Sequence, residues 1–291
     1  MEGIHISSTI GRLGNHIITL MNAIYMARIF NYRWITLSND FKYFPKVLDV
    51  YNKKIYQSRD DIALNGLKDI SGFAIFHISH YLGESKKILD FDKYKAVYED
   101  FFPILKANIA ELQELQGNIP TDLNENTTLY THLKFTDNLL ENTHYKYNVL
   151  PVNLYVRLMI DYKFDTLAVI TDNNRQNPYL VELKKQLDKH GKTLAVQSTN
   201  IWTDFYTLVN AKYMVMDMST FTWTAHLASS KKQYVFMWPM FYTRFLAKYR
   251  QYVDIMLFND ADMIRKTNYC YYNMYNYPEC GEWFATKEQL N

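Results

Sequence analysis

Between residues 166 and 238, short apolar segments alternate with amphipathic ones, and this alternation constrains the fold more than any other feature of the chain. It predicts strands at 166–171, 193–197, 213–217 and 234–238, and helices at 179–189, 202–210 and 221–228. Strands joined through helices run parallel, because each helix returns the chain to the edge from which the strand started. We therefore predict an α/β fold with a parallel sheet.

The N-terminal part shows the same pattern once more. A short apolar strand at 3–6 leads through a polar, glycine-containing turn into a long helix that ends at Asn31, and a strand at 34–37 follows. Apolar residues spaced three and four apart predict that this helix buries a single stripe, formed by Ile17, Leu20, Met21, Ile24 and Ala27. This unit is a Rossmann-like beginning, so we expect two Rossmann-like domains.

The turn before the first helix is a candidate anion site. It contains Gly11, Arg12, Gly14 and Asn15, between the strand and the helix. Backbone amides and the positive end of the helix dipole favour a phosphate at such a point, and Arg12 adds a guanidinium group. The alternative is structural, because flexible turns use glycine and helices commonly start near asparagine without any ligand.

The carboxyl ends of the predicted parallel strands are the second candidate site, because ligands of open α/β sheets bind there. Asp172 follows the strand at 166–171 and has the position of a ribose or base contact. Asp217, Ser219, Thr220 and Phe221 lie where the strand at 213–217 leads into the helix at 221–228, and amides and hydroxyls at such a point suit a phosphate or ribose. Ser219 or Thr220 could equally be a helix N-cap, and both roles are compatible.

A strand predicted at 129–135 carries a third candidate group. Its alternation places Leu129, Leu133 and Phe135 on one face, and Tyr130, His132 and Lys134 on the other. A lysine fixed near a leaving diphosphate would stabilise the charge that develops as the bond to the sugar breaks. The alternative is an ordinary exposed polar face.

Length and composition predict how the chain is divided and where it works. With 291 residues and 48% hydrophobic content, we expect a first domain at 1–145, a second domain at 146–265, and a tail at 266–291 that packs back on the first domain. A helix near 152–162 would lead into the second domain. Two cysteines, Cys270 and Cys280, and an N-terminus without signal-peptide features favour a cytoplasmic protein without a membrane span.

Several function classes lack support in the sequence. A net charge of +2 without basic blocks argues against nucleic-acid binding. No His/Cys cluster has metal-ligand spacing, and Asp-x-Asp, present at 90–92 and 260–262, is expected about once by chance, so no metal is predicted. No P-loop lysine motif, hydrolase elbow or three-glycine dinucleotide fingerprint is present, which disfavours P-loop enzymes, hydrolases and nicotinamide oxidoreductases.

Taken in order, the three candidate groups resemble the fucosyltransferase superfamily that includes the α1,2-, α1,6- and protein O-fucosyltransferases. Its Gly-Arg-x-Gly-Asn-Gln signature is similar to residues 11–16, with His16 in place of glutamine. Its His-x-Arg-Arg-x-Asp signature is similar to 132–137, where Lys134 and Phe135 replace the arginines. Its third signature resembles 171–173 and 217–223, in which Ser219, Phe221 and Trp223 align best.

The resemblance implies a GT-B fold with two facing Rossmann-like domains, an acceptor-side domain at 1–145 and a nucleotide-sugar-binding domain at 146–265. It also implies a metal-independent reaction that inverts the anomeric carbon. In that family the first arginine of the middle signature binds the donor phosphate, and Lys134 occupies its position. Lysine keeps the charge but loses the two-pronged guanidinium. The asparagine of the first signature corresponds to Asn15, which would orient the sugar or the diphosphate.

We therefore expect a glycosyltransferase that moves a sugar, L-fucose from GDP-fucose in the first instance, onto the hydroxyl of a saccharide or glycoconjugate. Arg12, Asn15 and Lys134 are the expected catalytic residues. The expected donor-binding residues are Gly11, Gly14, His132, Asp172, Asp217, Ser219, Thr220 and Phe221. The alternatives are another nucleotide sugar, such as UDP-xylose, and a catalytically inactive carbohydrate-binding protein on the same scaffold.

Overall fold

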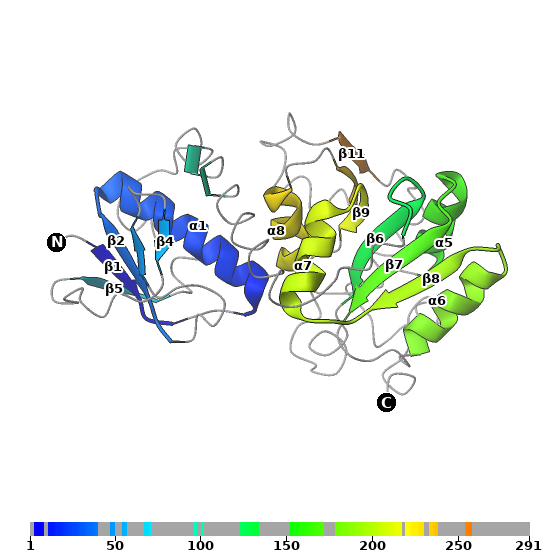
Figure 1. Cartoon of the computed structure of the whole chain (residues 1–291), viewed down its shortest axis with the longest axis horizontal. Coiled ribbons are helices and arrows are strands. Elements are labelled where there is room, and N and C mark those ends of the chain that lie inside the picture. The colour runs from blue at the N-terminus through cyan, green and yellow to red at the C-terminus, as the bar shows by residue number, and fades with distance from the viewer. Residues whose placement is uncertain are drawn as a thin grey trace, which may run out of the picture. The chain divides into compact units, whose positions relative to one another are not determined.

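The chain divides into two compact units, residues 1–112 and 113–291, and each is described here by itself. A computed structural model (Figure 1) describes residues 3–8, 11–39, 47–49, 54–56, 67–71, 96–97, 100–101, 123–133, 152–171, 178–216, 219–229, 233–237 and 254–257. Among the helices in these ranges, none is at once long and apolar enough to cross a bilayer.

The first unit contains a five-stranded sheet of order β4-β3-β2-β1-β5. Its elements are β1 (Gly3–Ile6), α1 (Leu13–Phe30), β2 (Trp34–Leu37), β3 (Val47–Asp49), β4 (Lys54–Tyr56) and β5 (Lys68–Ile70). β2 and β5 flank β1 and both pair with it in parallel, which confirms the predicted strand-helix-strand unit. An antiparallel hairpin, β3 and β4, extends the sheet beyond β2.

Helix α1 is more deeply buried than its sequence predicts. Every residue from Leu13 to Ala27 except Asn15 is buried, so the expectation of a single apolar stripe is wrong. Ile18, Tyr25 and Met26 lie off that stripe and are also buried, and so are the polar residues His16, Thr19 and Asn22. The helix ends at Asn31 as predicted. Asn31 has a left-handed φ of 57°, and its amide donates to the carbonyls of Ala27 and Arg28.

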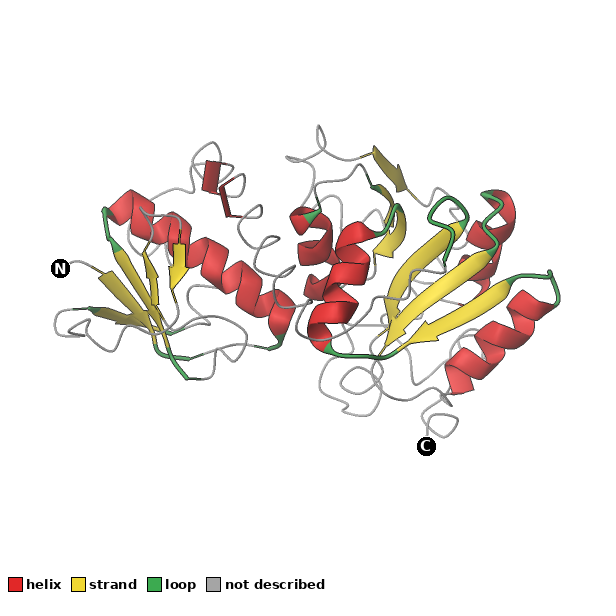
Figure 2. Ribbon diagram, viewed as in Figure 1, coloured by secondary structure: helices red, strands yellow, loops and turns green. Residues whose placement is uncertain are grey.

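The second unit contains a six-stranded sheet of order β11-β10-β9-β6-β7-β8, in which all pairs are parallel. The strands are β6 (Thr128–Leu133), β7 (Thr166–Thr171), β8 (Thr193–Gln197), β9 (Tyr213–Met216), β10 (Tyr234–Met237) and β11 (Asp254–Leu257). The helices are α5 (Val152–Asp161), α6 (Pro178–Asp188), α7 (Ile201–Asn210) and α8 (Thr220–Ala228). The predicted alternation of strands and helices is thus confirmed to within one or two residues (Figure 2).

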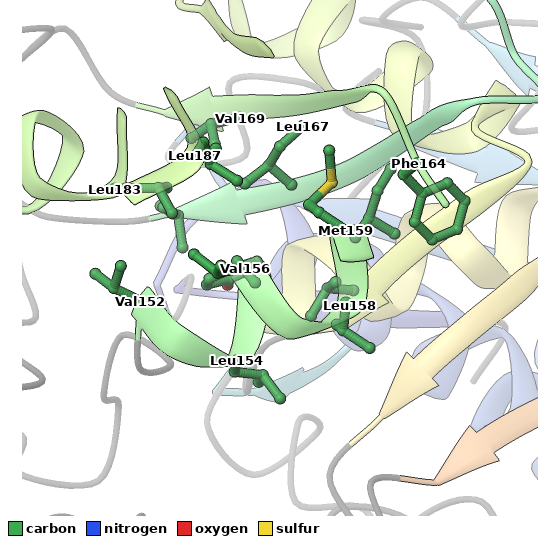
Figure 3. Packing of buried hydrophobic residues seen from close by; sticks show 14 of the residues in the cluster. Val152, Leu154, Val156, Leu158, Met159, Phe164, Leu167, Val169, Leu183 and Leu187 are labelled. Atoms are coloured by element: carbon green, nitrogen blue, oxygen red, sulfur yellow. The ribbon is translucent and has the colours of Figure 1, made fainter. Parts of the chain in front are cut away.

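Helices cover both faces of this sheet. α5 and α6 pack on the face that carries Leu129 and Leu133, and together they form a buried hydrophobic cluster (Figure 3). Val152, Val156 and Met159 of α5, with Leu183 and Leu187 of α6, meet Leu167 and Val169 of β7 there. α7 and α8 contact each other, and Phe221 of α8 reaches His132 on the opposite face of β6. Both faces of β6 are therefore covered, as in a doubly wound sheet.

The largest difference from the predicted organisation concerns β6. We expected this strand in the first domain, but it pairs with β7 and β9 in the middle of the second sheet, in the unit that begins at residue 113. A boundary after residue 145 therefore places β6 in the wrong unit, because sequence alternation reveals that a strand exists but not which sheet it joins. α5 likewise lies within the second unit, where it packs on β7 and α6.

One further expectation, the tail at 266–291, lies outside the described residues, and the packing of that tail on the first domain stays a prediction. The strands β3, β4 and β5, which the sequence did not predict, fall in the region between residues 40 and 125 that has only short apolar runs.

Candidate functional site

The order of strands defines a topological switch point in the second unit. β7 and β8 are added on one side of β6, whereas β9, β10 and β11 are added on the other side. The direction of winding therefore reverses between β6 and β9. The helices that follow these two strands leave on opposite faces, and the carboxyl ends of the strands at such a reversal are where open parallel sheets bind their ligands.

Two predicted site residues meet at this reversal. His132, the next-to-last residue of β6, lies with its ring centroid 4.8 Å from that of Phe221, and the ring planes are inclined by 44°. Both side chains are half-buried. The middle and third sequence signatures are about 85 residues apart in the chain, and this contact brings them together within one unit.

The start of α8 lies next to this contact. Ser219 is its N-cap, and the Ser219 hydroxyl accepts a hydrogen bond of 3.1 Å from the amide of Phe221. Thr220 is the first helical residue, and Thr222 Oγ1 donates to the carbonyl of Ser219 at 3.0 Å. The capping interpretation of Ser219 is therefore correct. The cap also fixes the positive end of the helix dipole beside Phe221, so that capping and anion binding remain compatible.

Packed aromatic rings hold Phe221 in place. Its ring meets that of Phe205 edge to face, with centroids 5.4 Å apart, and Phe205 in turn meets Trp202 at 6.3 Å. Phe205 is fully buried and Trp202 nearly so. This series of rings from α7 through α8 to β6 gives His132 a rigid support, because buried aromatic side chains have few alternative rotamers. Sequence analysis missed Phe205, although it is apolar in a predicted helix.

Tyr130 lies two residues before His132 and so shares its face of β6. Burial, with a smaller contribution from Glu125, raises the pKa of the Tyr130 hydroxyl above its ordinary value. The hydroxyl therefore stays protonated near neutral pH and is unsuited to act as a general base.

The first unit holds the other predicted group, at the start of α1. Gly11 has a φ of 67°, a conformation that favours glycine, and the side chain of Asn15 lies against it. Arg12 is exposed and has an extended backbone at the N-cap position, from which its side chain makes no capping hydrogen bond. Gly14 is buried in the first turn of the helix. The structural interpretation is thus correct for Gly11, whose backbone conformation requires glycine.

The structure thus groups the described site residues in two places. Gly11, Arg12, Gly14 and Asn15 lie together at the start of α1, and His132, Ser219, Thr220 and Phe221 lie together in the second unit. Lys134, Asp172 and Asp217 lie outside the described residues. In the sequence, each follows a described strand directly: Lys134 comes after β6, Asp172 after β7 and Asp217 after β9.

No cluster of three or more His, Cys, Asp or Glu side chains with a geometry suited to a metal ion occurs within the described part of the chain. Whether the reaction depends on a metal remains a prediction from the sequence resemblance.

No protein-family model matches the sequence, and no curated protein matches it. Among solved structures, the chain is similar to POFUT1 in complex with GDP, with 11% identity, a TM-score of 0.41, and coverage of 78% of this chain and 95% of that one. It is similar to a mutant of Arabidopsis thaliana FUT1 in complex with GDP, with 11% identity, a TM-score of 0.44, and coverage of 80% and 70%. For POFUT1 in complex with GDP-fucose the identity is 9%, the TM-score 0.40, and the coverage 80% and 96%.

Proposed function

We propose that this chain is an inverting glycosyltransferase that transfers a sugar from a nucleotide sugar, L-fucose from GDP-fucose, to a hydroxyl of a saccharide or glycoconjugate. One observation carries the proposal. The contact of His132 with Phe221 joins two of the three sequence signatures at the winding reversal of a six-stranded parallel sheet, where a nucleotide is expected to bind.

Charge supports the same location for the donor diphosphate. The N-terminus of α8 directs its dipole and amides toward the carboxyl edge of the sheet, beside the cap at Ser219. Lys134 is the second residue after His132 in the sequence, and Asp217 follows β9. In this proposal Lys134 and the α8 amides bind the diphosphate, and Asp172 binds the ribose or base.

The reaction proposed is a single displacement. The acceptor hydroxyl oxygen attacks the anomeric carbon, the bond from that carbon to the diphosphate oxygen breaks, and the nucleoside diphosphate leaves with the bonding electrons. A base takes the hydroxyl proton, and no described residue is assigned to that role. Negative charge grows on the leaving diphosphate, so a fixed cation stabilises the transition state more than the ground state.

In this proposal the first unit supplies the acceptor side. Arg12 and Asn15, at the start of α1, would then orient the diphosphate or the sugar. No metal takes part in this proposal, because the positive groups named above meet the charge of the diphosphate.

The middle signature favours a second donor as the alternative. Lys134 and Phe135 stand where the family has arginines, and a lysine cannot hold a phosphate with two parallel hydrogen bonds. A different nucleotide sugar, such as UDP-xylose, is therefore the second candidate.

A thermal-shift series with the full chain tests the proposal. The ligands are GDP, GDP-fucose, UDP and UDP-xylose, and each is measured once with Mg²⁺ and once with EDTA. A ligand that binds the folded state raises the melting temperature according to its affinity. We expect the largest rise with GDP and GDP-fucose, followed by slow release of fucose from GDP-fucose without an acceptor. A larger rise in melting temperature with the UDP ligands would support the second donor. Binding without donor hydrolysis would indicate an inactive sugar-binding protein. No rise in melting temperature with any ligand would refute the proposal.

A further inference from the structure

Thr171 makes a hydrogen bond that the proposed function does not use. It is the last residue of β7, it is 3% exposed, and its Oγ1 donates to the backbone carbonyl of Leu133 at 2.7 Å. Leu133 is the last residue of β6, and the two residues are register partners. The bond therefore connects the ends of two neighbouring strands at the carboxyl edge of the sheet.

The carbonyl that accepts this bond belongs to the peptide that joins β6 to Lys134. Its orientation decides the direction in which the chain leaves the strand. A buried hydrogen bond in a low-dielectric environment is costly to break, so the Thr171 hydroxyl restricts the rotation of this peptide. His132 is the residue immediately before Leu133, and it lies next to the restricted peptide.

His132 is also held by Phe221. The end of β6 is thus fixed twice, through its backbone by β7 and through the ring of His132 by α8. The two contacts lie on different atoms of adjacent residues and come from two different elements, the neighbouring strand β7 and the helix α8. Neither contact alone fixes both the backbone and the side chain.

We propose that Thr171 is a positioning residue, whose hydroxyl sets the geometry of the carboxyl end of β6 and thereby of the donor-binding groups of that strand. This inference rests on the proposed function only where nucleotide affinity is measured, and the effect on the His132 ring is independent of that function. It predicts that loss of the hydroxyl weakens donor binding by more than its effect on stability explains, because small displacements of binding groups have large effects on recognition.

Tyr155 provides a matched control. Its hydroxyl lies 3.2 Å from Oγ1 of Thr131, so it also makes a buried hydroxyl contact with β6. Thr131 belongs to the face of β6 opposite His132. Tyr155→Phe removes this contact without changing the shape of the side chain. Thr171→Val removes the Thr171 hydroxyl in the same way, and Thr171→Ser keeps it.

The experiment compares the full-length wild type, Thr171→Val, Thr171→Ser and Tyr155→Phe. The melting temperature reports stability, and titration calorimetry with GDP, UDP and ADP reports nucleotide affinity. The variants are compared by their affinity for the nucleotide that the wild type binds most tightly. The ¹H–¹³C resonance of the His132 ring, assigned by its loss in His132→Gln, reports the end of β6 without any ligand.

We expect Thr171→Val and Tyr155→Phe to lower the melting temperature by similar amounts. Thr171→Val alone should weaken nucleotide binding, on the order of tenfold, and shift the His132 resonance, and Thr171→Ser should restore both. Equal affinities and equal His132 resonances in Thr171→Val and Tyr155→Phe would overturn the inference. If the wild type binds none of the three nucleotides, the proposed function fails, and the His132 resonance still decides the role of Thr171.

Discussion

The side-chain amide of Asn15 lies across the α-carbon of Gly11. A β-carbon built on Gly11 would collide with Nδ2 of Asn15 and would stand 2.9 Å from its Cγ. Gly11 also has a φ of 67°, so two separate properties require glycine at this position. The backbone conformation turns the chain into α1, and the missing side chain leaves room for the Asn15 amide. The glycine of the first signature thus determines where its asparagine lies.

Gly11→Ala is expected to destabilise the protein by about 1–2 kcal/mol through its left-handed backbone conformation, and to displace the Asn15 amide as well. Asn15→Ala removes the Nδ2 and Cγ that the new methyl group would meet. Urea unfolding of the two single variants and the double variant measures the coupling between the positions. We expect the double variant to lose less stability than the sum of the single variants. An exactly additive result would show that the collision costs nothing and that only the backbone matters.

Most regular elements of the second unit could be predicted, because alternating apolar strands and amphipathic helices leave a local pattern in the sequence. The order of the strands could not. The pairing of β6 with β9 connects residues more than 80 positions apart, and no local pattern encodes it. The same limit explains why the sequence assigned β6 to the first domain.

The candidate site was predicted by residue type and position in the sequence but not by its contacts. His132 and Phe221 were both expected to bind the donor, yet their mutual contact follows from the winding reversal alone. Thr171 was predicted only as the end of a strand and as part of the third signature, because a threonine at a strand end has no sequence signal for a hydrogen bond to the carbonyl of Leu133. Burial of α1 on every side was likewise hidden by its regular apolar stripe.

Lys134→Ala is expected to lower the turnover of sugar transfer on the order of a hundredfold while leaving the melting temperature nearly unchanged, because its proposed contact is strongest in the transition state. Lys184→Ala is the matched control. The Lys184 side chain is 60% exposed and pairs with Asp188 at 2.6 Å on the surface of α6. The rates of donor hydrolysis and of sugar transfer are measured for both variants and for the wild type. Equal rates in the Lys134 and Lys184 variants would exclude Lys134 from the mechanism.

Gln233→Leu is expected to destabilise the protein by about 3 kcal/mol, because the Gln233 amide closes the C-terminal end of α7. Its Nε2 donates to the carbonyls of Leu208, Val209 and Ala211 at 2.9, 3.3 and 2.7 Å, and the side chain is buried.

Asn210→Ala is the control for Gln233→Leu, since it removes a single half-buried amide hydrogen bond to the carbonyl of Tyr206. Its expected cost is about 1 kcal/mol or less. Urea unfolding compares the two variants, and losses of similar size would contradict the closing role of Gln233.

His226 is expected to make the protein less stable in mild acid. Its ring is buried, and its Nδ1 lies 2.7 Å from Oε1 of Gln233. Because Nε2 of Gln233 donates to three carbonyls, Oε1 is the acceptor, and Nδ1 of His226 carries the proton of the neutral ring. Burial lowers the pKa of His226 below its ordinary value, and the hydrogen bond to Gln233 opposes this only in part.

The sign of the pH dependence follows from this lowered pKa. The unfolded chain takes up a proton at His226 near its ordinary pKa of about 6.5, whereas the folded chain does so only at lower pH. The stability that the neutral ring contributes is therefore complete above about pH 6.5, and it is lost as the pH falls from there toward the folded pKa. His226→Phe removes the titrating group, so its free energy of unfolding should fall less between pH 7.5 and pH 5.5 than that of the wild type. Urea unfolding at both pH values measures the two decreases, and equal decreases would show that other groups cause the acid sensitivity.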